Sequence, residues 1–298
     1  MTLAETFDLV RPCLVAFIAK AAYGLSGAGP QIPPILGTGF FVGPTGLVAT
    51  NRHVVESFTH VPRDIQSGEA AVAALIFPGL DANGNPSEII VADVDNWWRL
   101  CSFSETNIWY AETVPELALV QLKVSETPSL FVDYQPGMLR TGLAVATAGF
   151  LSGDLGVRIH GEMKHVEPLL HRGTVSGLFP FGVSDPDGFV LEAALEAGAP
   201  GSPVFLEDQP VVVGMVQAVH RDHEEVIIAT GAPSILVPLT ANLSVGLPGH
   251  LLATACQEFL RVSESRASDF PTLASLIANA SASPIVPDAA PDGSDSAA

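Results

Sequence analysis

Short apolar runs separated by turn residues are the feature that most constrains the fold of this chain. Each run is rich in Val, Ile or Phe and is bounded by Gly, Pro, Asn or Asp, a pattern that predicts short β-strands. The 298 residues include 27 glycines and 24 prolines, enough for many tight turns. Strands at this spacing indicate an all-β barrel or sandwich. The predicted strands are Leu14–Ile18, Gly39–Val42, Leu47–Thr50, Ala71–Phe77, Ile89–Val94, Leu117–Leu122, Leu143–Thr147, Gly188–Ala193, Val211–Val219 and Val226–Ala229.

The strands fall into two groups, which we expect to form two domains. A Pro136-Gly137 turn lies between the groups and marks the connection. The expected N-terminal domain covers residues 8–133, and the expected C-terminal domain covers residues 137–247.

The character of the sequence changes after Val245. Apolar residues recur at helical spacing over 249–265 and again over 270–279, which predicts a helical segment at 248–280. Residues 281–298 are mostly Ser, Pro, Ala and Asp. This tail is predicted to be disordered because it cannot bury enough apolar surface.

Composition excludes several classes of protein. Hydrophobic residues make up 48% of the chain, yet no apolar run approaches the roughly 18 residues that a spanning helix needs, so we expect no membrane association. Glu5 and Asp8 stand where a secretory signal would carry Lys or Arg. The three cysteines, Cys13, Cys101 and Cys256, have neither metal-site nor disulfide spacing. These features favour a cytoplasmic location.

Charge argues against a nucleic-acid partner. The chain carries 13 Lys and Arg against 32 Asp and Glu, a net charge of −19, and such a surface repels a polyanion. His220 and His223 are three residues apart and could be considered as a metal pair, but they lie in a predicted hairpin loop without a third ligand. We therefore expect neither a metal nor a cofactor.

The strongest local pattern is GTGFFVGPTGLVATNRH, from Gly37 to His53. It predicts two short strands joined by a Gly43–Gly46 turn, the second ending just before the histidine. At a strand end the sheet fixes the backbone while the imidazole remains free to face a cleft, as a general base requires.

Two later segments complete a recognisable set. The sequence PELALVQL at 115–122 places Glu116 before an apolar strand, and GAPGSPVF at 198–205 forms a turn-rich loop. The set resembles the trypsin-like (chymotrypsin-fold) serine peptidases of the bacterial cytoplasmic type, whose motifs read G-[ST]-G-F, T-x-x-H-V, D-L-A-L and G-x-S-G-[GS]-P. The resemblance extends over roughly residues 8 to 265.

The resemblance implies a fold and a set of roles. The fold is two antiparallel Greek-key β-barrels followed by a C-terminal helix. His53 takes the place of the general base, Glu116 that of the acid orienting it, and position 200 that of the nucleophile. Gly198 takes the place of a backbone donor in the oxyanion hole. Gly173–Ser176, Val212–Gln217 and Ala232–Leu239 match further strands of the second barrel.

Position 200 departs from the family pattern because it holds Pro200. Proline has neither a hydroxyl group nor a backbone N–H, so the substitution removes the attacking atom and one of two oxyanion donors. Loss of a nucleophile alone costs on the order of 10⁶ in kcat, and loss of a donor costs a further ~10²–10³. We therefore expect a catalytically silent protein.

Two other residues bear on this expectation. Glu116 stands where the family has aspartate, and its extra methylene extends the side chain by about 1.5 Å unless the backbone recedes. Glutamate serves as the acid in other triads, so beside Pro200 this residue indicates relaxed selection for triad geometry. Ser202 is a possible substitute nucleophile, but two residues of chain place it too far from His53 unless the loop is remodelled.

The resemblance also locates a substrate pocket. Its floor falls at Ala194, and its wall at Gln217, Ala218 and Val219. The floor carries no charge, and Val219 stands where open-pocket members have glycine. We expect any ligand residue to be small and apolar.

Three functional hypotheses follow from these residues. The favoured one is a silent peptidase-fold protein that keeps the inter-barrel cleft to bind a peptide or protein. The alternative is an active serine endopeptidase that cleaves after small apolar residues through a remodelled loop using Ser202. A purely structural scaffold is the third. The oligomeric state is left open.

Overall fold

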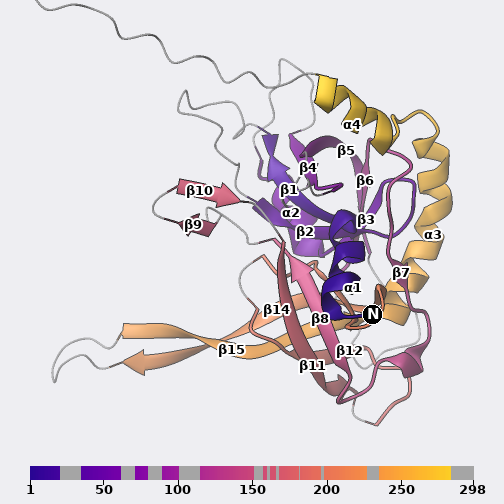
Figure 1. Ribbon diagram of the computed structural model, residues 1–298. Helices are drawn as coiled ribbons and strands as arrows, with labels where there is room; N and C mark the ends of the chain where they lie inside the picture. Colours follow the sequence, from indigo (N-terminus) through magenta and orange to yellow (C-terminus); the bar gives the residue numbers. More distant parts are fainter. Residues whose placement is uncertain are drawn as a thin grey trace, which may run out of the picture.

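The computed structural model describes residues 1–20, 35–61, 71–79, 89–100, 115–150, 157–159, 162–165, 168–180, 182–195, 198–226 and 235–282. Along 157–159, 162–165, 219–226, 235–242 and 280–282 only the backbone is described. Strands dominate and form two barrels, with the C-terminal helices along one side (Figure 1).

The first barrel contains six antiparallel strands and is closed. Around the barrel they follow the order β1-β2-β3-β6-β5-β4, with β4 pairing back to β1. The strands are β1 (Leu14–Ala19), β2 (Ile35–Phe41), β3 (Leu47–Thr50), β4 (Val72–Ile76), β5 (Ile90–Arg99) and β6 (Ala118–Leu122).

The second barrel has the order β13-β8-β11-β12-β15-β14, and it is closed by the pairing of β13 with β14. The hairpin of β14 and β15 extends well beyond the barrel (Figure 1). The strands are β8 (Ala144–Gly149), β11 (Leu169–Phe179), β12 (Gly188–Glu192), β13 (Pro203–Leu206), β14 (Val211–Val226) and β15 (Ile235–Pro248). Short strands flank it: β7 (Phe131–Val132) pairs with β14, and β9 (Val157–Ile159) pairs with β10 (Glu162–His165).

Both barrels have the same strand order. When each barrel's strands are counted along the chain, the neighbours run 1-2-3-6-5-4 in both, and the jump from the third strand to the sixth is a Greek-key connection. The predicted pair of antiparallel Greek-key barrels is confirmed.

The C-terminal helices are confirmed as well. They are α3 (Gly249–Ala267) and α4 (Leu273–Ala282). The helix α3 holds the first barrel through Phe259, whose ring lies 5.3 Å from that of Trp98, and through an Arg266–Asp95 ion pair of 2.7 Å. No helix in the described ranges is long and apolar enough to cross a membrane.

Four further helical elements in the described residues lie N-terminal to these. The helix α1 (Leu3–Val10) was not predicted, and it begins with a capping box formed by Thr2 and Glu5. A short 3₁₀ turn, Arg11–Cys13, follows it, and a second, η4 (Pro136–Met138), lies at the predicted connection between the barrels. The helix α2 (Arg52–Phe58) follows β3.

The core has three parts. One cluster fills the first barrel around Phe17 and Phe41, and another fills the second around Phe189 and Val204. The third joins the barrels and includes Phe40. Cys13 and Cys256 are buried free thiols in this joint cluster, and burial raises the pKa of each to about 12; Cys101 lies outside the described residues.

Candidate functional site between the two barrels

His53 lies in the first turn of α2 and not at the strand end that the sequence suggested. Between β3 and the helix there is a single residue, Asn51, whose backbone is extended (φ −80°, ψ 153°). The helix is held against the first barrel because Val54, Val55 and Phe58 are buried. This packing fixes the His53 backbone and leaves its side chain 52% exposed.

Glu116 binds His53 through one carboxylate oxygen. Oε1 lies 2.6 Å from His53 Nδ1 and accepts the His53 backbone N–H at 2.9 Å. Burial alone would raise the pKa of Glu116, but these two hydrogen bonds and the charges of His53 and Arg52 outweigh it and hold the pKa below its ordinary value. The longer side chain of Glu116 therefore still reaches both the ring and the backbone of His53.

Pro200 occupies a tight turn that suits proline. The Ser202 N–H donates to Ala199 O at 3.0 Å, and Gly201 has φ of +89°. These are features of a type II turn, which favours proline at its second position and requires glycine or asparagine at its third. Residues 200 and 201 meet both requirements, so the loop accepts proline without distortion.

The first barrel anchors this loop through Thr38 of β2. The Thr38 hydroxyl donates to Gly198 O at 3.0 Å and accepts the Phe150 N–H at 2.8 Å. Gly198 is buried with φ of +106°, and the hydrogen bond from Thr38 holds its carbonyl group against β2. A Cβ on Gly201 would collide with Thr38 O, so the loop lies directly on β2.

A contact that the sequence did not predict crosses between the barrels at Asn51. Its Nδ2 donates to Val216 O at 3.0 Å and to Gln217 O at 2.8 Å, both in β14. Val216 O also accepts the Gly201 N–H at 2.9 Å. The Val216 carbonyl group thus links Asn51, which precedes α2, to the 198–202 loop and to β14, which holds the predicted pocket wall.

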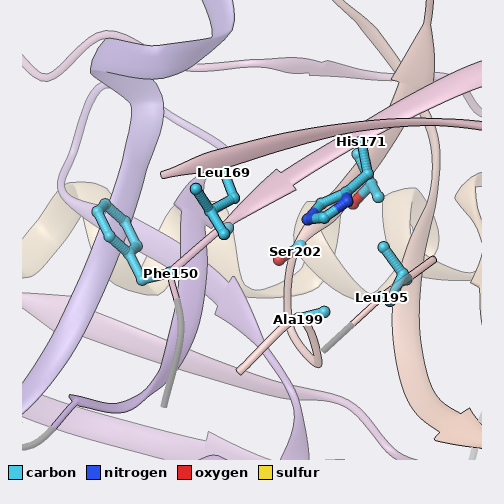
Figure 2. A pocket seen from close by; sticks show the side chains of 8 residues that line it. Phe150, Leu169, His171, Leu195, Ala199 and Ser202 are labelled. Carbon is cyan, nitrogen blue, oxygen red and sulfur yellow. The ribbon is translucent and has the colours of Figure 1, made fainter. Parts of the chain in front are cut away.

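Ser202 is not brought to His53. Its side chain is 1% exposed, and its hydroxyl has no hydrogen-bond partner among the described residues. The hydroxyl points toward Gly149, where an added Cβ would collide with it. Gly149 is the last residue of β8 in the second barrel, and both residues line a small pocket there (Figure 2).

The predicted pocket residues belong to the second barrel, on β14 and just after β12. Gln217 and Ala218 follow one another in β14, with Ala218 exposed and paired to Val245 of β15. Ala194 is exposed after β12. Val219 continues β14, but its side chain lies outside the described part, so the expected narrowing stays a prediction.

The metal-pair candidates lie in a strand. His220 and His223 belong to β14 and not to a loop, and their side chains are not described. Among the described residues no group of three His, Cys, Asp or Glu side chains is placed to hold a metal ion.

Comparisons with known proteins bear on the family and the fold of the chain. No curated protein matches the chain. Two solved structures are similar to it at 14% identity over 88% of this chain: the HtrA-type protease AlgW with decapeptide (TM-score 0.49, 68% of that chain) and a serine-to-alanine variant of AlgW with decapeptide (TM-score 0.50, 67% of that chain). The family model of the trypsin-like peptidase domain matches residues 37–215, more than half of the chain. The chain belongs to the trypsin-like peptidase domain family.

Proposed function

We propose that this protein is a catalytically silent member of its family that binds a peptide or protein segment between its two barrels. The proposal assigns position 200 to the nucleophile of the family motif, and the observation that supports it is that Pro200 lies in a turn that suits proline. The His53–Glu116 pair remains in place beside a loop that offers neither a hydroxyl group nor a backbone N–H at position 200.

The loop has little freedom to recover a nucleophile. Thr38 holds Gly198 O, and Val216 O holds the Gly201 N–H. An active endopeptidase using Ser202 would have to break this arrangement and turn a buried hydroxyl away from Gly149. These contacts favour the silent protein over the active one.

The proposed ligand is an extended peptide with small apolar side chains. The exposed Ala218 and the uncharged Ala194 offer no ionic partner to a basic or acidic residue. A protease of the same fold, the AlgW variant, is described with a decapeptide. We further propose a reducing, cytoplasmic location, in keeping with the two buried free thiols.

Fluorescence anisotropy with a library of fluorescein-labelled capped peptides rich in Ala and Val tests the proposal. We expect saturable binding without cleavage. Ala218→Arg should abolish binding by placing a long charged side chain on the pocket wall. Ser176→Arg, at an exposed position of β11, is the matched control and should leave binding unchanged. Cleavage of the peptides would refute catalytic silence, and equal binding by both variants would refute the assigned location.

A further inference from the structure

The segment that connects the two barrels carries exposed aromatic and apolar side chains. Phe131 and Tyr134 are each 58% exposed, and Met138 is 38% exposed. Large apolar side chains that gather on one part of a surface mark an interaction site, whereas singly scattered ones need no explanation. We call residues 131–140 the connecting segment; it runs from β7 through the 3₁₀ turn η4 and begins beside α3 (Figure 1).

The backbone of the connecting segment is held from both ends. Leu130, just before it, is 4% exposed, and Leu139, near its end, is 5% exposed. The strand β7 pairs with the start of β14. The buried Asp133 fixes the turn that follows β7, because its Oδ1 accepts the Gln135 N–H at 3.3 Å. The exposed side chains therefore project from a segment that is anchored in the core.

The connecting segment has the composition of an interface core. Aromatic residues, Met and Arg are enriched in such cores, whereas Lys, Asp and Glu are depleted. In a chain with a net charge of −19, Asp133 is the only acidic residue from Thr127 to Gly153, and it is buried. Two copies of the chain would therefore repel one another less through this segment than through the acidic surface elsewhere. The exposed residues of the segment are Phe131, Tyr134, Gln135, Gly137, Met138 and Arg140.

Two exposed charges of opposite sign border the apolar side chains. Arg140 ends the connecting segment, and Asp208 lies in the turn that leads from β13 into β14, the strand that pairs with β7. Neither has an ion pair among the described residues, whereas the neighbouring Glu207 is bound by Arg172 at 2.6 Å. In a two-fold interface each contact occurs twice, once on either side of the axis. Arg140 of one copy and Asp208 of the other can therefore form two identical pairs.

We propose that the connecting segment is a two-fold interface between two copies of this chain. Phe131, Tyr134 and Met138 form its centre, and reciprocal Arg140–Asp208 pairs form its rim. The apolar centre supplies most of the affinity, and the charged rim fixes the orientation of the two copies. The interface includes none of the residues of the peptide-binding surface proposed above, so it does not depend on that function.

Sedimentation velocity of the intact protein over about 1–300 μM tests for the dimer, for which we expect a Kd of about 10–100 μM. Phe131→Ala and Tyr134→Ala should each weaken the dimer about tenfold or more, because a few aromatic anchors carry most of the binding energy of an interface. Val91→Ala is the matched control, since Val91 is 42% exposed on β5 of the first barrel; it should leave the Kd unchanged. A parent protein that is monomeric at every concentration would overturn the proposal.

Charge reversal tests the two-fold arrangement itself. Arg140→Glu puts a carboxylate against Asp208 of the other copy, and Asp208→Arg puts a guanidinium against Arg140, so each variant alone should be monomeric over the same concentrations. An equimolar mixture of the two variants should dimerise again, because every rim contact then joins opposite charges. Both positions are exposed, and thermal melts establish that each variant folds. A mixture that stays monomeric, or a single variant that dimerises as well as the parent, would contradict the proposed interface.

Discussion

Glu116 Oε1 accepts two hydrogen bonds from one residue, His53: one from the ring Nδ1 at 2.6 Å and one from the backbone N–H at 2.9 Å. The ring N–H that points to the carboxylate leaves the other nitrogen, Nε2, as the free acceptor. The orientation of the imidazole is therefore the one a general base needs, although position 200 has no hydroxyl group to donate a proton to it.

Glu116→Gln should destabilise the protein at neutral pH and not in acid. The folded-state pKa of Glu116 lies below the ordinary 4.5, so its contribution to stability is fully present above that pH and is lost as the pH falls through the lower folded value. We expect a loss of about 1 kcal/mol at pH 7, discounted for partial exposure. Urea unfolding at pH 7 and pH 3 measures it. Glu258→Gln, at an exposed position of α3, should show no such difference; a constant gap for Glu116→Gln at both pH values would contradict the assignment.

Pro200→Ser should restore a reactive hydroxyl. The turn tolerates serine at its second position, and the His53–Glu116 pair is already oriented. We expect a fluorophosphonate probe to label position 200 in this variant, with no label on Ser202 in the parent protein, because that side chain is buried. Mass mapping locates the label.

Two variants control this experiment. Pro200→Ala loses the proline ring without gaining a hydroxyl, so it should remain unlabelled, and like Pro200→Ser it should unfold about 0.4–1 kcal/mol more easily. His53→Ala in the Pro200→Ser background should abolish labelling. An unlabelled Pro200→Ser protein would mean that the site has lost more than its nucleophile.

Gly201→Ala should destabilise the loop strongly. Gly201 has φ of +89°, and an added Cβ would collide with Thr38 O. Together the backbone strain and the displacement of β2 should cost about 2 kcal/mol or more. Gly137→Ala is the control, since a Cβ there meets nothing within 4 Å. Guanidinium unfolding compares the two, and similar losses would contradict the turn geometry.

The strands of the first barrel were predictable because their apolar runs are bounded by turn residues. The strand β13 was missed as a strand because it has only four residues and begins with Pro203. The helix α2 was missed because it has only seven residues, buries one face and closely follows a strand. Both barrels have the same strand order, but the sequence contains no matching repeat. Strand order depends on which strands pair along their edges, and the same pairing can be made by different residues.

The site was predictable only where a local motif carried it. His53, Glu116 and Pro200 each lie within a short pattern of their own. The contacts of Thr38 and Asn51 cross between barrels, to partners 160 and 165 residues away. Such contacts exist only once the two barrels have docked, so no local pattern reveals them.

Asn51→Ala should loosen the joint between the barrels. The Asn51 amide donates to two β14 carbonyls, Val216 O and Gln217 O, and without it Gln217 O loses a described donor while Val216 O keeps the Gly201 N–H. We expect a loss of about 2 kcal/mol in the free energy of unfolding. Hydrogen exchange of the Gly201 amide should also accelerate, because its acceptor carbonyl is less firmly held.

Asn51→Asp tests the contribution of the hydrogen bonds while leaving the volume of the side chain almost unchanged. The carboxylate is nearly the same size but would direct an oxygen at two carbonyl oxygens, so it should destabilise the protein by more than Asn51→Ala does, about 3 kcal/mol. Gln135→Ala, at an exposed position between the barrels, should change the free energy of unfolding by less than about 0.5 kcal/mol. If Asn51→Asp were as stable as the parent, the amide would not be the group that joins α2 to β14.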